Sequence, residues 1–362
     1  MTARRPKKLI VTGGAGFIGS AYIRKVIANT DWYVVNLDKL TYAASLDAVS
    51  GLEGSRRYRL QQGDICDAQS VVQLLKLEQP DAIVHFAAES HVDRSIDAPS
   101  IFLQTNVMGT LALLEAAARY CDGMTGQRRD AFRFHHISTD EVFGSLGETG
   151  AFDEESAYRP NSPYSASKAS ADHLVRAWHH TYGLPTITSN CSNNYGPFQF
   201  PEKLIPLTII RALSGQPLPV YGDGGNVRDW LYVEDHVAAL IAVLERGRIG
   251  ATYNVGGGAE ARNIDLVKTL CGILDRLAPA ASHRKHEQLI QFVPDRPGHD
   301  RRYAINAAKI GSELGWGPVE TLASGLEKTV FWYLDNRAWW EAILNRKYDT
   351  TRLGLNVAQG RA

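Results

Sequence analysis

The amino-acid sequence predicts an α/β protein built on a doubly wound parallel sheet. Between residues 8 and 190, short apolar segments of strand length alternate with longer segments of helical character, the order in which helices cover both faces of a parallel sheet. Segment 82–87 is almost wholly apolar, as a strand buried on both faces requires. Glycines at 13, 16 and 19 join a short strand, Lys8–Thr12, to a helical segment, 17–28. These three observations place one large sheet in the first half of the chain.

The glycine-rich turn after the first strand is typical of a dinucleotide-binding fold of the Rossmann type. Glycines at 13, 16 and 19 allow a tight turn, a close approach of the backbone to a pyrophosphate, and close packing of helix on strand. The exposed amides where the helix begins, at Phe17 and Ile18, can bind anionic oxygens. The strand before the glycines and the helix after them are the context that this motif needs.

The second strand, 33–37, ends at Asp38, which favours NAD over NADP. The carboxylate lies roughly 20 residues beyond the glycines, where a ribose-binding acid is expected. Two ribose hydroxyls can donate to it, whereas a 2′-phosphate would be repelled. Two alternatives stay open, since Lys39 could serve such a phosphate and Asp38 could be a simple turn acid.

The remaining strands and helices of the large sheet follow in order. We expect strands at 59–62, 132–138 and 186–190, and helices at 68–77, 100–119 and 163–182. Asp64 and Ile65 end the third strand, where they would border the adenine of a dinucleotide. The small residues Ala87 and Ala88 end the fourth strand, where they leave room for the cofactor against the strand ends.

The end of the fifth strand carries the side chains best suited to catalysis. Thr139, Asp140 and Glu141 follow one another and supply a hydroxyl and two carboxylates. Tyr164 and Lys168 are four residues apart in the helix at 163–182, so both lie on one face. The ammonium beside the phenol should lower the tyrosine pKa from its usual value of ~10 and make it a general base. Each pattern also has a structural alternative, a chance helical pair or a helix cap with first-turn acids.

After Asn190 the sequence changes in character, and we expect a smaller C-terminal α/β lobe. Residues 1–190 would bind the dinucleotide, 191–350 would mainly bind substrate, and 351–362 would be a tail. Segment 228–255 is expected to rejoin the large sheet, with further helices at 203–214, 309–314 and 322–333. Arginine side chains suit a diphosphate, although each could instead form a surface ion pair. The candidates are Arg228, Arg262, Arg296, Arg301 and Arg302, of which Arg228 and Arg296 are favoured by their glycine- and proline-rich loops.

The composition argues against several other classes of protein. Lys plus Arg and Asp plus Glu are equal at 39 each, so a nucleic-acid partner is not expected. The longest purely apolar run, 237–244, is far too short to span a membrane. The four cysteines show no metal-ligand or redox spacing, which indicates a reducing cytoplasm. Neither His135-His136 nor His179-His180 is placed to form a metal site, and none is expected.

With these motifs assembled, the sequence resembles the extended short-chain dehydrogenase/reductase superfamily over nearly its whole length, and within it the dTDP-glucose 4,6-dehydratase family. The glycine motif at 12–19 and the Tyr164–Lys168 pair are common to the superfamily. The more specific matches are the motifs at 87–95, 137–142, 193–197, 228–230 and 295–300. The Asp140–Glu141 pair is distinctive, because related epimerases lack both acids and related GDP-mannose and CDP-glucose dehydratases keep one.

The resemblance implies an NAD-dependent dehydration of dTDP-glucose to dTDP-4-keto-6-deoxyglucose in deoxysugar biosynthesis of the rhamnose type. Oxidation at C4 would acidify the C5 proton, which Glu141 would remove while Asp140 protonates the departing C6 hydroxyl. Tyr164 would take the C4 hydroxyl proton, Lys168 would stabilise the phenolate and hold the nicotinamide ribose, and Thr139 would hydrogen-bond the C4 oxygen. Family dimers imply that the helices at 100–119 and 163–182 pair across a two-fold axis.

The resemblance also carries the ligand contacts over to this sequence, residue by residue. Cofactor contacts are implied at Gly13, Gly16, Phe17, Ile18, Gly19, Asp38, Lys39, Leu40, Thr41, Asp64, Ile65, Phe86, Ala87, Ala88, Ser90, Thr105, Tyr164, Lys168 and Asn194. Substrate contacts are implied at Ser90, Thr139, Asp140, Glu141, Asn193, Lys203, Leu204, Pro219, Tyr221, Arg228, Asn263, Asp295, Arg296 and His299.

Other functions stay open on the sequence. A nucleotide-sugar 4-epimerase would keep Tyr164 and Lys168 without needing the two acids, and a 4,6-dehydratase could act on another nucleotide sugar. A cofactor-sensing regulator on the same fold would need none of these side chains. Which of Asp140 and Glu141 holds a proton is a family assignment that the sequence leaves undecided.

Overall fold

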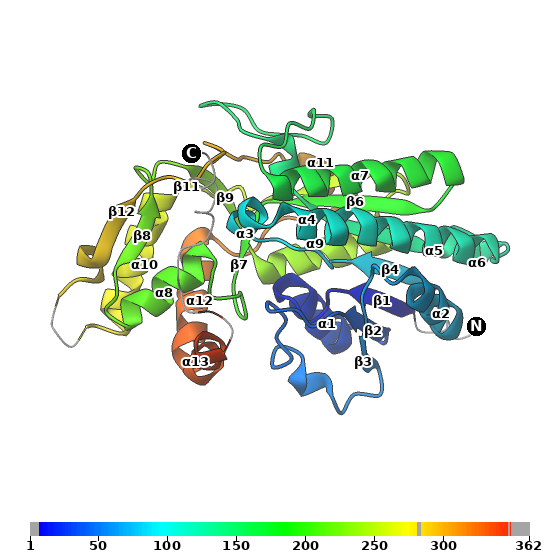
Figure 1. Cartoon of the computed structure of the whole chain (residues 1–362), viewed down its shortest axis with the longest axis horizontal. Coiled ribbons are helices and arrows are strands. Elements are labelled where there is room, and N and C mark those ends of the chain that lie inside the picture. Colours follow the sequence, from blue (N-terminus) through cyan, green and yellow to red (C-terminus); the bar gives the residue numbers. More distant parts are fainter. Residues whose placement is uncertain (1–6, 281–283, 347, 349–362) are drawn as a thin grey trace.

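The computed structural model describes residues 7–280, 284–346 and 348. Its centre is a seven-stranded sheet in the order β10-β6-β5-β4-β1-β2-β3, and every neighbouring pair of strands is parallel (Figure 1). The strands are β1 (Lys8–Thr12), β2 (Tyr33–Asp38), β3 (Tyr58–Gln62), β4 (Ala82–His85), β5 (Arg133–Thr139), β6 (Thr186–Cys191) and β10 (Thr252–Val255). The predicted doubly wound parallel sheet is confirmed. The expected tail at 351–362 lies outside the described residues.

Alternating side chains of the strands bury themselves against helices on both faces of this sheet. In β1, Ile10 packs with residues of α2 (Ala68–Glu78) and α5 (Thr110–Asp122), and α7 (Pro163–Tyr182) covers the same face. Leu9 and Val11 face the other way and pack with α1 (Phe17–Asn29) and α9 (Val233–Arg246). This two-sided burial explains why the strands read as continuous apolar runs.

The chain reverses its direction of winding between β1 and β4. From β1 it proceeds to β2 and β3 on one side, and it then crosses to β4, β5 and β6 on the other. In such sheets ligands bind in the crevice outside the carboxyl ends of the strands at this switch point. The motifs after β1, β2, β4 and β5 all end at that edge.

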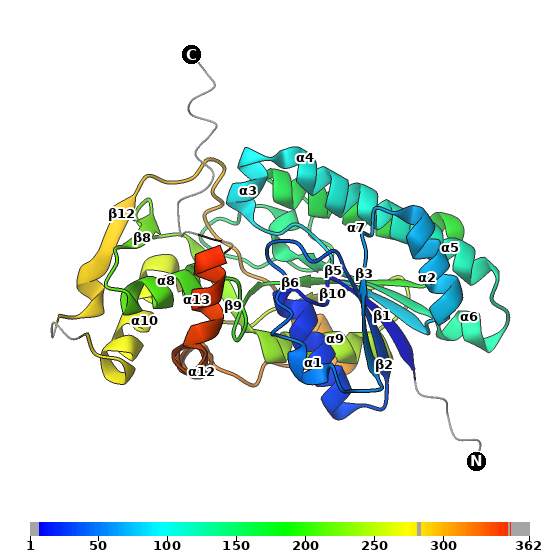
Figure 2. The same cartoon turned by 60° about the horizontal axis from the view of Figure 1, so that its bottom comes forward.

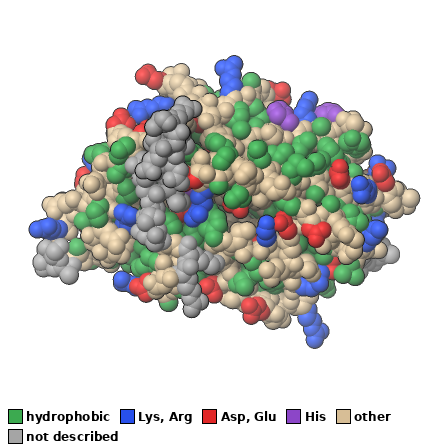
Figure 3. Space-filling model, viewed as in Figure 1, with side chains coloured by type: hydrophobic (Ala, Val, Ile, Leu, Met, Phe, Trp, Pro, Cys, Tyr) green, Lys and Arg blue, Asp and Glu red, His purple; other side chains and the backbone are tan. Residues whose placement is uncertain are grey.

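The helix expected at 100–119 is longer and less regular in the structure. It runs continuously from Pro99 to Asp122 as α4 (Pro99–Phe102), a π-helical segment (Leu103–Gly109) and α5. By length and composition it could cross a membrane, but a core helix passes the same test, and α5 packs against α2 and α7. Its outer face leaves Ile101, Leu103 and Met108 about half exposed, and Figure 3 shows apolar side chains over this side of the molecule.

A smaller lobe lies beside the large sheet (Figure 2). It contains a three-stranded sheet, β11 (Glu260–Arg262), β9 (Val227–Tyr232) and β7 (Asn193–Tyr195), and a two-stranded sheet, β12 (Ile290–Val293) and β8 (Leu218–Tyr221). Its helices are α8 (Leu204–Leu213), α10 (Asn263–Leu277), α12 (Leu322–Asp335) and α13 (Arg337–Arg346). They enclose their own aromatic-rich core. The return to the large sheet is made by α9 and β10, with α11 (Ala308–Leu314) packed on both, whereas β9 belongs to the small lobe.

Short elements complete the description. They are α3 (Val92–Asp97), α6 (Gln127–Ala131) and the 3-10 turns Ser50–Leu52, Asp140–Phe143 and His286–Leu289. Of these, α3 and the turn at Asp140–Phe143 follow directly from the carboxyl ends of β4 and β5, so they border the switch-point crevice.

Candidate active site

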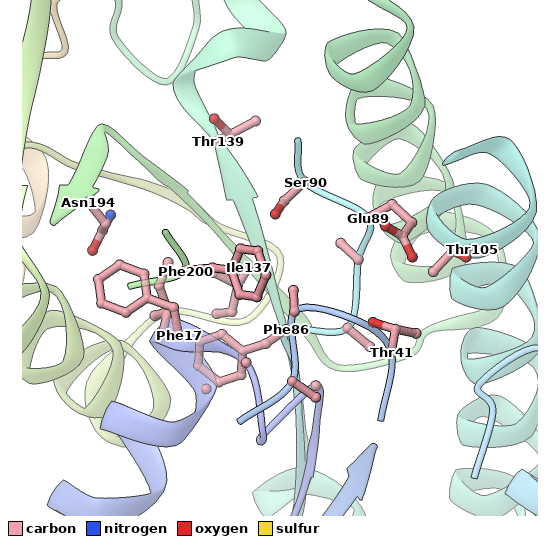
Figure 4. A pocket seen from close by; sticks show the side chains of 18 of the residues that line it. Phe17, Thr41, Phe86, Glu89, Ser90, Thr105, Ile137, Thr139, Asn194 and Phe200 are labelled. Atoms are coloured by element: carbon pink, nitrogen blue, oxygen red, sulfur yellow. The ribbon is translucent and has the colours of Figure 1, made fainter. Parts of the chain in front are cut away.

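A cavity of about 310 Å³ opens along the carboxyl ends of the strands and continues to the small lobe, a size within the usual range for small-molecule sites. Figure 4 shows part of its wall, with Phe17 from the start of α1, Phe86 from the end of β4 and Thr139 from the end of β5. Of the nineteen positions implied as cofactor contacts, all but Leu40 line this cavity. The cavity therefore brings together the segments that follow six different strands, β1 to β6.

The glycine turn leaves no room for side chains where a dinucleotide would lie. Gly13 has φ +70°, and a Cβ there would stand 2.6 Å from the backbone nitrogen of Ala87. A Cβ on Gly19 would stand 2.3 Å from the Gly13 carbonyl oxygen. Helix α1 begins after Gly16 with no side-chain cap among the described residues, so its first amides are available to an anion. This cradle suits a pyrophosphate.

Asp38 is held as an acceptor at the end of β2. Its two carboxylate oxygens accept hydrogen bonds from the backbone N–H groups of Ala15 and Leu40, each at 2.8 Å. Leu40 thus orients Asp38 and does not itself line the cavity. Lys39, kept open above as a phosphate ligand, places its amine 2.7 Å from the Asp64 carboxylate. With Asp38 and Asp64 both on the wall, this corner favours ribose hydroxyls over a 2′-phosphate.

Thr139, Glu141, Tyr164 and Lys168 line one end of the same cavity. Thr139 is the last residue of β5, and its hydroxyl accepts a hydrogen bond from the Glu141 N–H at 3.3 Å, which caps the short turn that follows. Helix α7 is started by a capping box at Ser162 and buries Tyr164 and Lys168 on one face. These two side chains lie one helical turn apart, as predicted.

The expected lowering of the Tyr164 pKa is wrong for this arrangement. Burial raises the pKa of Tyr164 well above its ordinary value, Glu141 adds to the rise, and a hydrogen bond with Thr139 opposes it. The Lys168 amine instead donates to the carbonyl oxygen of Ile137 at 2.8 Å. Burial also lowers the pKa of Lys168 itself. Helix spacing alone could not show that burial changes the pKa of Tyr164 more than the neighbouring Lys168 ammonium does.

The two acids lie in different electrostatic surroundings, although burial raises the pKa of both. Asp140 is 1% exposed, and its Oδ2 has no hydrogen-bond partner among the described residues. Burial raises its pKa well above the ordinary value, and Glu141 and Asp229 raise it further. Burial also raises the pKa of Glu141, but three cations oppose this rise, namely Arg296, Arg228 and Lys203. A proton shared by the two acids is therefore held more readily by Asp140 than by Glu141.

The implied substrate contacts divide into two groups. Five line the cavity: Ser90, Thr139, Glu141, Asn193 and Lys203. Nine do not, and they are Asp140, Leu204, Pro219, Tyr221, Arg228, Asn263, Asp295, Arg296 and His299. Eight of these nine residues belong to the small lobe or its loops, and Asp140 is the exception. The charges of Arg228 and Arg296 nevertheless act within the cavity, because both oppose the rise in the pKa of Glu141.

Contacts with α3 attach the substrate loops to the large sheet. Asp93 accepts from Arg296 Nη1 at 3.2 Å and from the Tyr221 hydroxyl at 3.0 Å. The three remaining arginine candidates lie in ion pairs away from the cavity, the alternative raised above: Arg262 with Asp265, Arg301 with Asp223, and Arg302 with Glu260.

Some cavity residues were missed by sequence reasoning. They are Leu37, Ala43, Ala44, Gly63, Glu89, Ile137, Ser138, Cys191, Ser192, Gln199, Phe200 and Glu202. Glu89 lies within the motif at 87–95, so that motif held a usable signal. Phe200 and Glu202 come from the loop after β7, where only closeness to the motif at 193–197 pointed to the site. The described residues bring together no group of three His, Cys, Asp or Glu that could hold a metal.

Comparison with known proteins agrees with this geometry. The family model for GDP-mannose 4,6 dehydratase matches residues 10–329. The dTDP-glucose 4,6-dehydratase of Neisseria meningitidis is 58% identical over 351 residues, covering 96% of this chain and 99% of the relative.

Two solved dTDP-glucose 4,6-dehydratases share the fold. The enzyme from Streptomyces venezuelae, with NAD bound, is 45% identical, with a TM-score of 0.84 over 93% of this chain and 99% of its own. That from Bacillus anthracis, in complex with NAD, is 43% identical, with a TM-score of 0.83 and the same coverage. The Asp140–Glu141 pair and the Tyr164–Lys168 pair of the present chain agree with these likenesses. The chain belongs to the dTDP-glucose 4,6-dehydratase family of the extended short-chain dehydrogenase/reductase superfamily.

Proposed function

We propose that this protein uses NAD to convert dTDP-glucose into dTDP-4-keto-6-deoxyglucose by removing water, a step of deoxysugar biosynthesis. The observation that carries the proposal is the pair of acids after β5. Asp140 and Glu141 are adjacent at the end of one strand, and the pKa of Asp140 is raised well above its ordinary value, whereas three nearby cations oppose the rise at Glu141. An elimination needs one group that gives a proton and one that takes a proton, whereas a 4-epimerase needs neither.

The cofactor would be held by the residues around the glycine turn. The amides at the start of α1 suit its pyrophosphate, Asp38 suits a ribose diol, and Tyr164 and Lys168 lie where the nicotinamide end would be. When bound, NAD supplies a reversible hydride acceptor, so the sugar is a C4 ketone between hydride loss from C4 and hydride return to C6. The ketone is needed because it turns the C5 carbanion into an enolate.

The side chains of this protein would handle the protons of both stages. Tyr164 takes the C4 hydroxyl proton during oxidation, for which it must be ionised despite its raised pKa, with Thr139 hydrogen-bonded to the same oxygen. Glu141 then takes the C5 proton, the C6–oxygen bond breaks, and Asp140 gives its proton to the leaving hydroxyl, which departs as water. Glu141 finally returns its proton to C5, and the proton taken by Tyr164 replaces the one that Asp140 gave, so that only water is lost overall.

The cations of the small lobe supply recognition of the diphosphate. Lys203 lines the cavity, and Arg228 and Arg296 lie close enough to Glu141 to lower its pKa. Guanidinium forks match phosphate oxygens well. The remaining implied contacts, such as Asn193 and His299, would then fix the base and sugar. We propose residues 1–190 with α9 and β10 as the cofactor domain, and the small lobe as the nucleotide-sugar domain.

The test is to incubate the purified protein and NAD with dTDP-glucose, UDP-glucose and CDP-glucose and to measure product masses. We expect dTDP-glucose to lose one water and to give a product that absorbs strongly in alkali. Turnover of UDP-glucose or CDP-glucose alone would reassign the nucleotide. A product of unchanged mass with inverted C4 would instead establish an epimerase and overturn the proposal.

We further propose a cytoplasmic homodimer formed by the long helix 99–122 and α7. Apolar side chains are exposed on this face at Ile101, Leu103 and Met108, and Tyr182 ends α7 at 55% exposure. Light scattering should give twice the chain mass. Replacing Leu103 by a charged residue should yield monomers, and an unchanged dimer mass in that variant would place the interface elsewhere.

A further inference from the structure

A buried carboxylate that the proposed reaction does not use lies beneath the catalytic residues. Asp172 is on α7 and is 5% exposed. It follows Lys168 by four residues and Tyr164 by eight, and all three are on the buried face of the helix. Asp172 does not line the cavity. Any effect that it has on the reaction must therefore pass through other side chains.

Three donors from two other parts of the chain, β5 and the loop before α7, converge on Asp172. Oδ1 accepts from His136 Nε2 at 3.0 Å, and Oδ2 accepts from the hydroxyls of Ser138 at 2.8 Å and Tyr158 at 2.9 Å. His136 and Ser138 are two apart in β5, so they point to the same face of the sheet. The carboxylate therefore fastens the catalytic strand to the catalytic helix.

One further contact extends this attachment to the end of the strand. The Asn190 amide in β6 donates to the Thr139 carbonyl oxygen at 3.1 Å, and the same nitrogen lies 3.4 Å from Asp172 Oδ2. Lys168 donates to the carbonyl oxygen of Ile137, on the same strand. Thr139, the last residue of β5, and Lys168, which donates to that strand, thus both lie next to residues that Asp172 holds.

The charge of Asp172 is buried beside two basic side chains, His136 at 3.0 Å and Lys168 one helical turn earlier on α7. A carboxylate buried this deeply requires compensation. Several titratable groups lie around Asp172 and Lys168. They are His85 of β4, His136 of β5, Cys191 of β6, Tyr158 of the loop before α7, and Tyr164 of α7 itself. Because a carboxylate only accepts, His136 uses Nε2–H as donor, and its Nδ1 has no partner among the described residues. A neutral His136 fits this pattern. The nearest remaining cation is the Lys168 ammonium, which donates to the Ile137 carbonyl oxygen and acts on Asp172 through its charge, without an ion pair between them.

We propose that Asp172 is a positioning residue that keeps Lys168 protonated and holds β5 in register with α7, so that Tyr164, Lys168 and Thr139 stay aligned. The inference deepens the proposed function and rests on it for the roles of Tyr164 and Lys168. The direction of the Lys168 pKa agrees, since burial lowers it and Asp172 is the first group that opposes this fall.

The test removes the charge while keeping the shape, with Asp172→Asn. We expect Lys168 to lose its proton at lower pH in this variant. In a Glu141→Gln background, which isolates the oxidation of C4, the alkaline limb of the pH profile should move down by about one unit or more. Asp172→Glu, which retains the charge, should keep the limb in place. A fall in rate with an unmoved limb in Asp172→Asn would overturn the electrostatic role.

Two matched controls separate charge from packing. Ser138→Ala and Tyr158→Phe each remove one hydrogen bond to Asp172 and leave its charge intact. Both should keep the alkaline limb where it is, even if the rate falls. If all three variants moved the limb equally, the effect would come from packing, and the proposal would be wrong.

A measurement on the unaltered residues keeps the inference testable if Asp172→Asn does not fold. Carbon NMR of labelled lysine side chains, with Lys168 assigned by its loss in Lys168→Arg, reports the Lys168 charge directly. An ammonium at neutral pH supports the proposal, and a neutral amine overturns it. Because this readout needs no sugar substrate, it stays decisive even if dTDP-glucose is not turned over.

Discussion

The cavity has a side proposed to bind the cofactor and a side proposed to bind substrate, and the two are assembled in different ways. Gly13, Asp38, Ala87 and Thr139 stand at or just beyond the ends of hydrogen-bonded parallel strands, so the register of one sheet fixes their relative positions. The substrate side draws on β8, β9, the start of α10 and the loop around Arg296, which belong to no common sheet. It is joined to the other side by side-chain contacts such as Asp93 with Arg296.

This difference explains where function can be adjusted in the molecule. Because neighbouring strands are hydrogen-bonded, the end of one strand cannot shift without shifting the ends of its neighbours. The geometry of hydride and proton transfer is therefore rigid. The substrate loops meet the large sheet through a few charged links, including Arg94 with Glu202 at 2.9 Å. Substitutions on the side formed by the large sheet should therefore change rates, and those on the side formed by the small lobe should mainly change substrate affinity.

The largest expected effect is that of Glu141→Gln. Without a base for the C5 proton, elimination should fall by about 10²–10⁴-fold, while oxidation of C4 continues and reduced nicotinamide accumulates. Rapid-mixing absorbance of the nicotinamide, together with product mass, measures both steps. If water is still lost at the wild-type rate, Glu141 is not the base.

Asp140→Asn should have the next largest effect, because it removes the acid for the leaving hydroxyl but keeps its shape. Oxidation should persist and elimination should fall, again by about 10²-fold or more. The wild-type pH profile of elimination has an expected sign. Glu141 must be ionised, so its raised pKa moves the acid limb up, and Asp140 must be protonated, so its raised pKa keeps activity through neutral pH.

An unchanged dehydration rate in Asp140→Asn would contradict this assignment. Asp140 deserves the test because it is buried behind the cavity wall and does not line it. Asp140→Glu is the informative companion, since it restores an acid on a longer side chain. Partial recovery there, with none in the amide variant, would identify the proton as the missing element.

The sequence predicts the side of the cavity formed by the large sheet better than the side formed by the small lobe. The glycines and Asp38 were predictable because a strand, a turn and a helix fix their spacing locally. Asp93 was not predicted as a link, because its partner Arg296 is 203 residues away. Likewise, Glu202 meets Arg94 across 108 residues. Helix α10 and the small strands of the lobe were also missed, and the Tyr164 pKa was predicted in the wrong direction because burial is a property of the folded state.

Arg296→Ala tests the side proposed to bind substrate and should act mainly on substrate affinity. Losing charge-assisted hydrogen bonds to a diphosphate should raise KM for dTDP-glucose by about ten- to hundredfold, with a smaller change in kcat. The acid limb should also move up, because Arg296 helps to lower the pKa of Glu141. Arg262→Ala is the matched control, since Arg262 pairs with Asp265 on the surface, and it should leave KM unchanged. A change in kcat alone would remove Arg296 from substrate binding.

Lys39→Ala, a substitution on the side proposed to bind the cofactor, should have the smallest effect. Lys39 lines the cavity, but its amine pairs with Asp64 and its side chain is 59% exposed. Exposed ion pairs contribute about 0–1 kcal/mol, so the NAD dissociation constant measured by calorimetry should change less than about fivefold. Asp38→Ala should weaken NAD binding far more, because it removes the acceptor that the Ala15 and Leu40 amides hold in place. Were Lys39 a ligand for a 2′-phosphate, its removal would selectively weaken NADP, and a selective loss of that kind would refute the assignment of NAD that Asp38 supports.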